Sequence, residues 1–171
     1  MAVMNGESDA RWYPVYTHAR AEKKAYEALK AKGIEAYLPL QRKLKQWSDR
    51  KKWVEEPLIS SYLFVNISPQ HMAEVLMTKG IARFLYFSGK VATMPDRQIK
   101  ELKLLLATDA ELEVTEEDLQ PGEKVTIKAG PLKGINGEII AHRSQKKLLL
   151  RLESMGQSLI VSMPPSYINR L

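Results

Sequence analysis

The residues that could carry out chemistry are few and lie far apart in the sequence. His18, His71 and His142 belong to no H-x-x-x-H or H-E-x-x-H pattern, and the chain has no cysteine. The glycine-rich patterns that cradle phosphates, G-x-x-x-x-G-K-[S/T] and G-x-G-x-x-G, are also missing. The adjacent pairs Glu55-Glu56 and Glu116-Glu117 would point to opposite sides of a strand. We therefore expect a binding protein and not an enzyme, with no cofactor and no metal.

A run of positive charge is the clearest chemical signal. Six Lys or Arg residues fall between Arg42 and Lys52, and Trp47 and Trp53 bracket their second half. Cations meet phosphates and aromatic rings stack on bases, so this mixture is typical of a loop or hairpin that contacts nucleic acid. The alternative is that the tryptophans only anchor the loop to a sheet. The residues expected to contact nucleic acid are Arg50, Lys51 and Lys52.

A second group of cations lies at the start of a predicted helix. Residues 18–33 place Ala21, Ala25 and Leu29 at helical spacing, with Thr17 as the expected cap and Gly33 as the expected end. A basic helix face is usually only solvated. The alternative is a further nucleic-acid surface, whose members are His18, Arg20, Lys23 and Lys24.

These side chains need a scaffold, and the first hundred residues predict one. Strand-like runs at 11–17, 34–40, 56–67 and 81–87 are interspersed with helical patterns at 18–33, 69–79 and 96–106. The order β-α-β-β-α-β-α predicts an α+β domain with an antiparallel sheet and flanking helices. Alternation places Tyr13, Leu63 and Val65 in its core.

The last fifty residues predict a small β domain. Val125 and Ile127 alternate with polar residues, and a glycine-rich loop leads to a second strand-like run that ends at Ile140. Asn136-Gly137 is the strongest two-residue turn signal, so we expect Gly137 in a tight turn with φ > 0. The runs KKLLLRL and SLIVSM continue the series of strands.

Charge divides the chain into three parts. Residues 1–106 carry eighteen Lys or Arg against eleven Asp or Glu, residues 107–120 carry six acidic and no basic residues, and residues 121–171 carry eight basic against three acidic. A composition shift followed by Pro-Gly marks a boundary, so we expect domains at 1–106 and 121–171 joined by an acidic linker at 107–120. The net charge of +6 suits a polyanionic partner, with solubility alone as the alternative.

Composition also bears on location. Hydrophobic residues make up 44% of the chain, which predicts a globular protein. The first ten residues are polar and contain no apolar signal segment, and no apolar run approaches the ~18 residues that span a bilayer. The lack of cysteine fits a reducing compartment. We expect a cytoplasmic monomer that does not enter a membrane.

Both halves resemble parts of one family. The spacing G-x-x-V-x-I-x-x-G-P-x-x-G-x-x-G-x-I, from Gly122 to Ile139, resembles the KOW motif of transcription elongation factors and ribosomal proteins. The N-terminal half resembles the NGN domain of the NusG family of elongation and antitermination factors. The matching residues are Trp12-Tyr13, Tyr16, Glu22, Pro39, Pro57-Leu58, Tyr62-Leu63-Phe64-Val65, Gly80-Ile81, Phe84 and Pro95. Glu56-Pro57-Leu58 with the run from Tyr62 to Val65 is more similar to specialised, operon-restricted RfaH-type paralogues than to the housekeeping factor.

The resemblance implies a fold and a function. It implies an α+β NGN-like domain followed by a small all-β, SH3-like KOW barrel. The NGN domain would bind the clamp helices of RNA polymerase, suppress pausing or termination, and lie near non-template DNA or nascent RNA. The implied polymerase-binding residues are Tyr16, Ile59, Tyr62, Phe64, Phe84 and Phe87, expected as a contiguous aromatic surface. The KOW domain would recruit a termination factor or a ribosomal protein through Leu132, Ile135 and Met155. Two alternatives are a ribosome-associated RNA-binding protein and an adaptor that makes protein contacts only.

Overall fold

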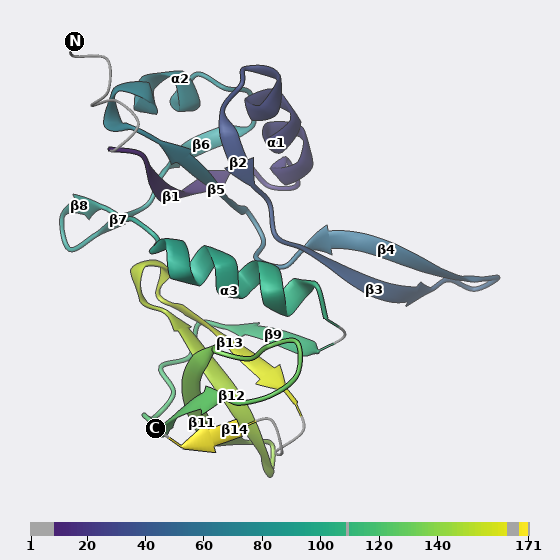
Figure 1. Ribbon diagram of the computed structural model, residues 1–171. Coiled ribbons are helices and arrows are strands. Elements are labelled where there is room, and N and C mark those ends of the chain that lie inside the picture. Colours follow the sequence, from purple (N-terminus) through teal and green to yellow (C-terminus); the bar gives the residue numbers. More distant parts are fainter. Residues whose placement is uncertain (1–8, 109, 164–167, 171) are drawn as a thin grey trace. The chain divides into compact units, whose positions relative to one another are not determined.

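The computed structural model describes residues 9–108, 110–163 and 168–170, and only the backbone of the last three (Figure 1). The chain divides into two compact units, Met1–Asp96 and Arg97–Leu171. Each unit has its own sheet, and each is described separately below.

Unit 1 is built on a four-stranded antiparallel sheet in the order β2-β5-β1-β6. The strands are β1 (Arg11–Thr17), β2 (Glu35–Tyr37), β5 (Tyr62–Ile67) and β6 (Ile81–Phe84). Helices α1 (Glu22–Ala31) and α2 (Met72–Leu76), the latter preceded by the 3-10 turn η2 (Pro69–His71), contribute to one apolar core against this sheet. Tyr13, Leu63 and Val65 are at most 4% exposed in that core, so the prediction for these three residues is confirmed.

The ends of α1 follow partly from the sequence. Gly33 has φ +76° and its N–H bonds to the carbonyl of Lys30, as expected of a residue that follows a helix. Thr17 is not the cap, because it is the last residue of β1 and Ala21 immediately precedes the helix.

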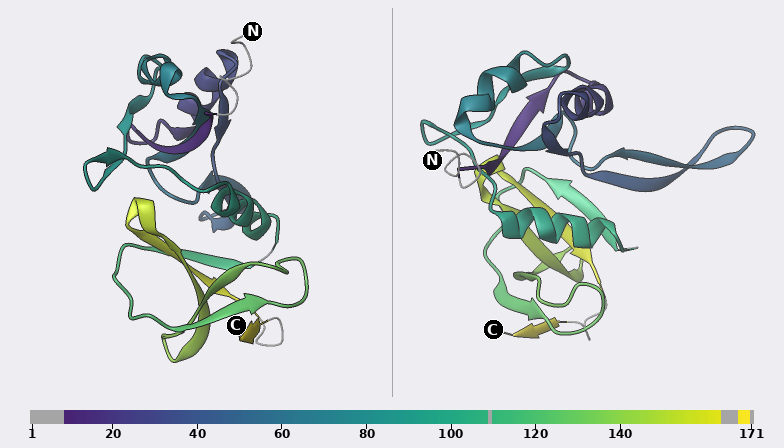
Figure 2. Two further views of the ribbon diagram at one scale, coloured as in Figure 1. Left: turned by 60° about the vertical axis from the view of Figure 1, so that its left-hand side comes forward. Right: turned by 45° about the horizontal axis from the view of Figure 1, so that its top comes forward.

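Two hairpins extend unit 1 beyond its sheet. Strands β3 (Leu40–Gln46) and β4 (Lys51–Pro57) pair only with each other and form a long two-stranded ribbon, called the ribbon below. The ribbon projects away from the helices and sheet of unit 1 (Figures 1 and 2). The shorter hairpin joins β7 (Tyr86–Phe87) to β8 (Lys90–Val91). The basic stretch predicted as a loop or hairpin is therefore a hairpin.

Unit 2 contains α3 (Asp96–Leu106), which starts at the boundary, and a six-stranded antiparallel sheet in the order β14-β10-β11-β12-β13-β9. Its strands are β9 (Glu111–Thr115), β10 (Glu123–Ile127), β11 (Asn136–His142), β12 (Gln145–Leu152), β13 (Gln157–Ser162) and β14 (Ile168–Arg170), with the 3-10 turn η3 (Glu153–Met155) between β12 and β13. The described pairings leave β14 and β9 at the two ends of the sheet, so closure into a barrel stays a prediction.

Residues 107–120, expected as a linker and called the acidic segment below, supply a strand to unit 2. Residues 111–115 form β9, which pairs with β13 from Ser158 opposite Thr115 to Ser162 opposite Glu111. Leu119 packs against an apolar cluster of Ile140, Leu149 and Ile160. This part of the chain is therefore attached to the sheet along much of its length.

A charged network also holds the end of the acidic segment. The Arg151 guanidinium donates from Nε to Glu138 Oε2 at 2.7 Å and from Nη2 to the carbonyl of Leu119 at 2.8 Å. Glu138 Oε1 accepts from the N–H of Gly122 at 3.0 Å. The hydrogen bond from Arg151 lowers the pKa of Glu138 below its usual value, and the same bond raises the pKa of Arg151. Both charges therefore persist at neutral pH.

The expectation for Gly137 is wrong, and the reason is steric. Gly137 lies in β11 opposite Val125 and is not among the glycines with positive φ, whereas Gly130 and Gly134 in the preceding loop have φ +78° and +95°. A Cβ at Gly137 would lie 2.7 Å from Leu148 Cδ1 and 2.8 Å from the carbonyl oxygen of Leu149. The position needs glycine because the next strand approaches closely.

Candidate polymerase and nucleic-acid interfaces

One face of the sheet in unit 1 carries an aromatic cluster. Tyr16 of β1 lies opposite Tyr62 of β5 with ring centroids 4.5 Å apart, and the Arg83 guanidinium lies 4.5 Å from the centroid of the Tyr16 ring. Phe64 stacks with Tyr37 of β2 at 6.4 Å. Burial raises the pKa of Tyr37 to about 12. These five residues are called the aromatic face below.

The aromatic face is only partly accessible. Tyr62 and Phe64 are 7% and 0% exposed, Tyr16 is half-buried, and Ile59 in the turn before β5 is 3% exposed. The structure does not show these residues as one exposed surface, and their role in docking stays a prediction. Strands β1 and β5 carry large apolar side chains at successive positions and are buried at nearly all of them, on both faces of the sheet.

The structure separates two further predicted residues from this face. Phe84 lies opposite Val15, and residues directly opposite each other share a face. Its ring meets Tyr13 edge-on at 5.9 Å within the core that α1 and α2 line. Phe87 lies on the β7–β8 hairpin and is 53% exposed. Of the six predicted polymerase-binding residues, Phe84 is thus in the core and Phe87 is the most accessible.

The ribbon has two chemically different faces, because successive residues of a strand alternate. Leu44 lies opposite Trp53, and Gln46 lies opposite Lys51. Arg42 shares their face, since its guanidinium lies 5.0 Å from the centroid of the Trp53 ring. We call this the tryptophan face. It consists of Leu40, Arg42, Leu44, Gln46, Lys51, Trp53, Glu55 and Pro57.

The opposite side of the ribbon is the lysine face. It consists of Gln41, Lys43, Lys45, Lys52, Val54 and Glu56. Glu56 accepts ion pairs from Lys45 at 2.9 Å and Lys43 at 3.4 Å. The hydrogen bond from Lys45 is the main reason that the pKa of Glu56 is lowered. One carboxylate therefore offsets part of the positive charge on this face.

All seven predicted nucleic-acid residues are exposed, and one hydrogen bond joins α1 to the ribbon. Arg50 lies in the turn of the ribbon, with Lys51 and Lys52 at the start of β4. On α1, Lys23 donates from Nζ to the backbone carbonyl of Glu55 in the ribbon at 2.7 Å. The remaining three residues, also exposed, are His18, Arg20 and Lys24.

The predicted KOW partner residues do not form an exposed surface. Leu132, Ile135 and Met155 are 4%, 2% and 7% exposed. The backbone of Ile135 is held by a bond from the N–H of Ile127, which orders the loop before β11. These apolar side chains are buried, and their role in recruiting a partner stays a prediction.

Sequence reasoning missed two features of these surfaces. Arg83 stacks on Tyr16. This contact could not be predicted without knowing the register in which β6 pairs with β1. The assignment of Arg42, Leu44 and Trp53 to one face was also missed. Alternation counted outward from the turn between Gln46 and Lys51 could have found it.

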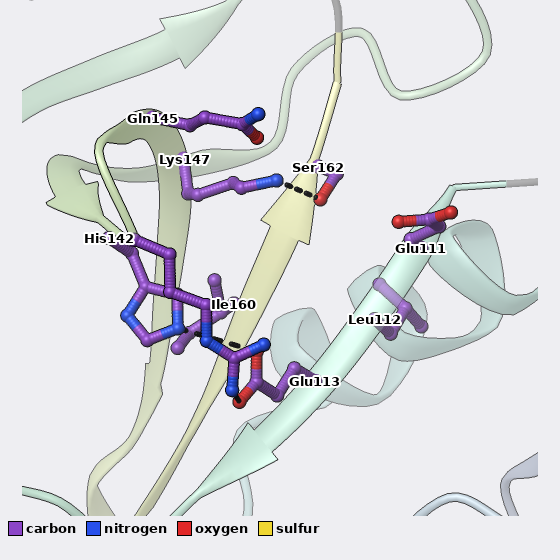
Figure 3. Close-up of a pocket in the computed structure, with 9 residues that line it drawn as sticks. Glu111, Leu112, Glu113, His142, Gln145, Lys147, Ile160 and Ser162 are labelled. Atoms are coloured by element: carbon purple, nitrogen blue, oxygen red, sulfur yellow. Dashed lines mark hydrogen bonds and ion pairs between the residues drawn. The ribbon is translucent and has the colours of Figure 1, made fainter.

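A hollow of about 320 Å³ opens in unit 2 between β9, β13 and the β11–β12 hairpin (Figure 3). Glu113 lies between His142 and Arg143, with His142 Nε2 at 3.4 Å from Oε2 and Arg143 Nη2 at 3.2 Å from Oε1. Lys147 donates to the hydroxyl of Ser162 at 2.6 Å. Arg143 pairs with Glu113 and Lys147 pairs with Ser162, whereas His142 Nε2 is buried without a hydrogen-bond partner among the described residues. We assign no reaction to this hollow.

Neither a metal centre nor a membrane span emerges from the described residues. Within residues 9–108, 110–163 and 168–170, no three His, Asp or Glu side chains are arranged to hold a metal ion. Over the same part of the chain, every helix is too short or too polar to cross a bilayer.

Comparison with known proteins identifies the family. The family model described as transcription termination factor nusG matches residues 10–103, which is more than half of the chain. A solved structure of Thermotoga maritima NusG, described by its domain interaction, is similar in fold, with a TM-score of 0.55, 20% identity, and coverage of 97% of this chain and 99% of that chain. A structure of the MjSpt4:Spt5 complex in conformation A is 15% identical with a TM-score of 0.30, covering 94% of this chain and 97% of that chain. From the extent of the family match, this chain belongs to the NusG family.

Proposed function

We propose that this protein is a transcription elongation and antitermination factor that binds RNA polymerase through unit 1 and suppresses pausing or termination. The observation that carries the proposal is the family match over residues 10–103, which covers nearly all of the described part of unit 1. The exposed Phe87 and the half-buried Tyr16 with its Arg83 partner supply aromatic groups of the kind that anchor protein interfaces.

The remaining roles follow from the two units. The basic ribbon and the cations of α1 contact non-template DNA or nascent RNA, and unit 2 recruits a termination factor or a ribosomal protein. The protein acts in the cytoplasm, as a monomer and without catalysis. The similarity of Glu56-Pro57-Leu58 and the run from Tyr62 to Val65 to RfaH-type factors supports a specialised, operon-restricted role.

The test combines polymerase binding with a transcription assay. We expect the full chain to retain RNA polymerase subunits in a pull-down from its host and to increase readthrough of pauses and terminators in a reconstituted system. Phe87→Ala should weaken polymerase binding by about 30-fold, equivalent to ~2 kcal/mol, if Phe87 is an anchor. Tyr86→Ala is the matched control, because Tyr86 is 62% exposed on the other side of the same hairpin.

Phe84→Ala separates a binding defect from a folding defect. Phe84 is 4% exposed in the core, so its truncation should cost ~3–5 kcal/mol of stability and lower binding only through unfolding. A full chain that retains no polymerase and does not alter readthrough would contradict the proposed function.

A further inference from the structure

We propose that the tryptophan face of the ribbon is a stacking platform for the unpaired bases of a single nucleic-acid strand. A base would stack on Trp53, and the flanking phosphates would meet Arg42 and Lys51. This inference rests on the proposed function, because it specifies how unit 1 meets nucleic acid, and it assigns the contact to one face of the ribbon only.

Trp53 is available for stacking and is held in place. It is 56% exposed, and its cross-strand partner Leu44 is 49% exposed. The ribbon is a two-stranded sheet that projects from unit 1, so the Trp53–Leu44 pair has no core to enter (Figures 1 and 2). The Arg42 guanidinium lies 5.0 Å from the centroid of the indole ring, which orients the ring and adds positive charge beside it.

An unpaired strand fits this face better than a duplex does. Bases in a duplex are stacked on each other and offer no free π-face, whereas an unpaired strand offers one at every base. A duplex contact through phosphates alone would need the cations and would leave Trp53 and Leu44 exposed. The combination of aromatic, apolar and cationic side chains on one face therefore favours single-stranded DNA or RNA.

The lysine face supplies the internal contrast. Its described residues include no exposed aromatic side chain. Each face carries one glutamate, Glu55 on the tryptophan face and Glu56 on the lysine face, where it pairs with Lys43 and Lys45. Lys51 and Lys52 are neighbours in sequence, both are exposed, and they lie on opposite faces. The two residues have the same charge and nearly the same position, so they distinguish a one-sided contact from general attraction of a polyanion.

Intrinsic fluorescence can report this contact. The chain has three tryptophans, of which Trp12 is buried at 6% exposure and Trp47 is exposed in the turn of the ribbon. Trp47→Phe therefore leaves Trp53 as the one exposed indole. We would titrate this full-chain variant with oligo-dT, with oligo-rU, and with a duplex of the same length. We expect quenching by the single strands and little by the duplex, and the dT and rU titrations show whether DNA or RNA binds more tightly.

Affinity measurements complete the test. Trp53→Ala should weaken single-strand binding by about tenfold or more, as expected when one base–aromatic stack is removed. Trp53→Phe should keep most of the affinity because it keeps an aromatic ring. Lys51→Gln should lower the affinity and flatten the salt dependence by about 0.7, while Lys52→Gln should do so less. Thermal melts should be unchanged, since every altered side chain is exposed.

Three results would overturn the inference. They are equal quenching by duplex and single strand, equal effects of Lys51→Gln and Lys52→Gln, and unchanged affinity in Trp53→Ala. Polymerase retention by Trp53→Ala separates this test from that of the proposed function. Abolished retention with intact oligonucleotide affinity would mean that the face docks a protein. Abolished oligonucleotide affinity with intact retention supports the inference as stated.

Discussion

The ribbon of unit 1 contains six cations between residues 42 and 52, and the acidic segment contains six anions between residues 107 and 120. Both stretches are expected at the surface from composition alone. In the structure the ribbon pairs only with itself and keeps Leu44 and Trp53 exposed. The acidic segment instead adds β9 to β13, packs Leu119 against an apolar cluster and ends at the Arg151–Glu138 network.

The difference lies in what each stretch has available to pack against. The acidic segment runs beside β13, whose residues Leu159, Ile160 and Val161 are at most 3% exposed, so its own apolar residues have a surface to cover. Within the described residues, the two strands of the ribbon form β pairs only with each other. Ion pairing is similar in the two stretches: Glu56 pairs with Lys43 and Lys45 in the ribbon, and Glu113 and Asp118 of the acidic segment lie near Arg143 and Arg151. The difference is that the acidic segment has apolar surface to cover and the ribbon does not.

The largest expected effect is on the network that holds the acidic segment. Arg151→Gln should lower the free energy of unfolding by about 2–3 kcal/mol, because Glu138 would keep a charge at 15% side-chain exposure without its main partner. Arg143→Gln is the matched control. Its partner Glu113 and Arg143 itself are well exposed, so we expect less than ~0.5 kcal/mol.

Chemical denaturation of the full chain measures both variants. Equal decreases in stability would mean that the Arg151–Glu138 pair does no more than a surface pair, and the contrast between the two stretches would then rest on apolar packing alone.

The next effect tests that packing. Leu119→Ala should cost about 1–2 kcal/mol, because a half-buried leucine would leave the Ile140, Leu149 and Ile160 cluster. Leu44→Ala in the ribbon should change stability by less than ~0.5 kcal/mol, since Leu44 is 49% exposed. A comparable decrease in stability at Leu44 would show that the ribbon packs against something and is not a free surface.

The fold could be predicted from the sequence more completely than the binding surfaces could. Periodicity and turn residues predicted the sheet of unit 1, its helices and the core positions of Tyr13, Leu63 and Val65. The strand in the acidic segment was missed, because Glu111 to Thr115 alternate charge with apolar residues only briefly and their partner β13 lies more than forty residues later. Gly137 was misjudged because local turn chemistry cannot reveal the close approach of β12.

The prediction of site residues was limited in the same way, because local sequence patterns do not reveal contacts between distant segments. Exposed cations were identified from composition, since charged side chains stay in water unless they are paired. Phe84 was placed on the wrong face because its position depends on the register of β6, which shifts between Tyr16 and Thr17 of β1. Leu132, Ile135 and Met155 lie in loops or turns, where no simple periodicity tells a buried side chain from an exposed one.

A smaller effect should appear in the pH dependence of unit 2. The pKa of Glu138 is lowered by Arg151, so its contribution to stability is present above the unfolded value near 4.5 and is lost as pH falls through the lower folded value. Burial raises the pKa of Glu101, with Arg97 partly offsetting the shift, so its ionisation costs stability above pH 4.5.

Denaturation measured between pH 3 and pH 7 should show a smaller loss of stability at acid pH, called the acid loss, in Glu138→Gln. Glu101→Gln should flatten the curve above pH 4.5 and leave the acid loss in place. An unchanged acid loss in Glu138→Gln would exclude that carboxylate as its source.

The smallest effect on stability is expected where the effect on binding is large. Replacing Arg50, Lys51 and Lys52 together with Gln removes three exposed cations from the ribbon, and Glu56 keeps its partners Lys43 and Lys45. The free energy of unfolding should therefore change by less than ~0.5 kcal/mol. Binding to single-stranded or bubble DNA should weaken, with little change in sequence preference. The slope of log affinity against log salt concentration should flatten by about 0.7 for each phosphate that the ribbon no longer neutralises.

If affinity and salt dependence both stay unchanged while the melt is intact, the ribbon carries only solvated charge. The nucleic-acid contact would then have to lie on the α1 face around Lys23 and Lys24.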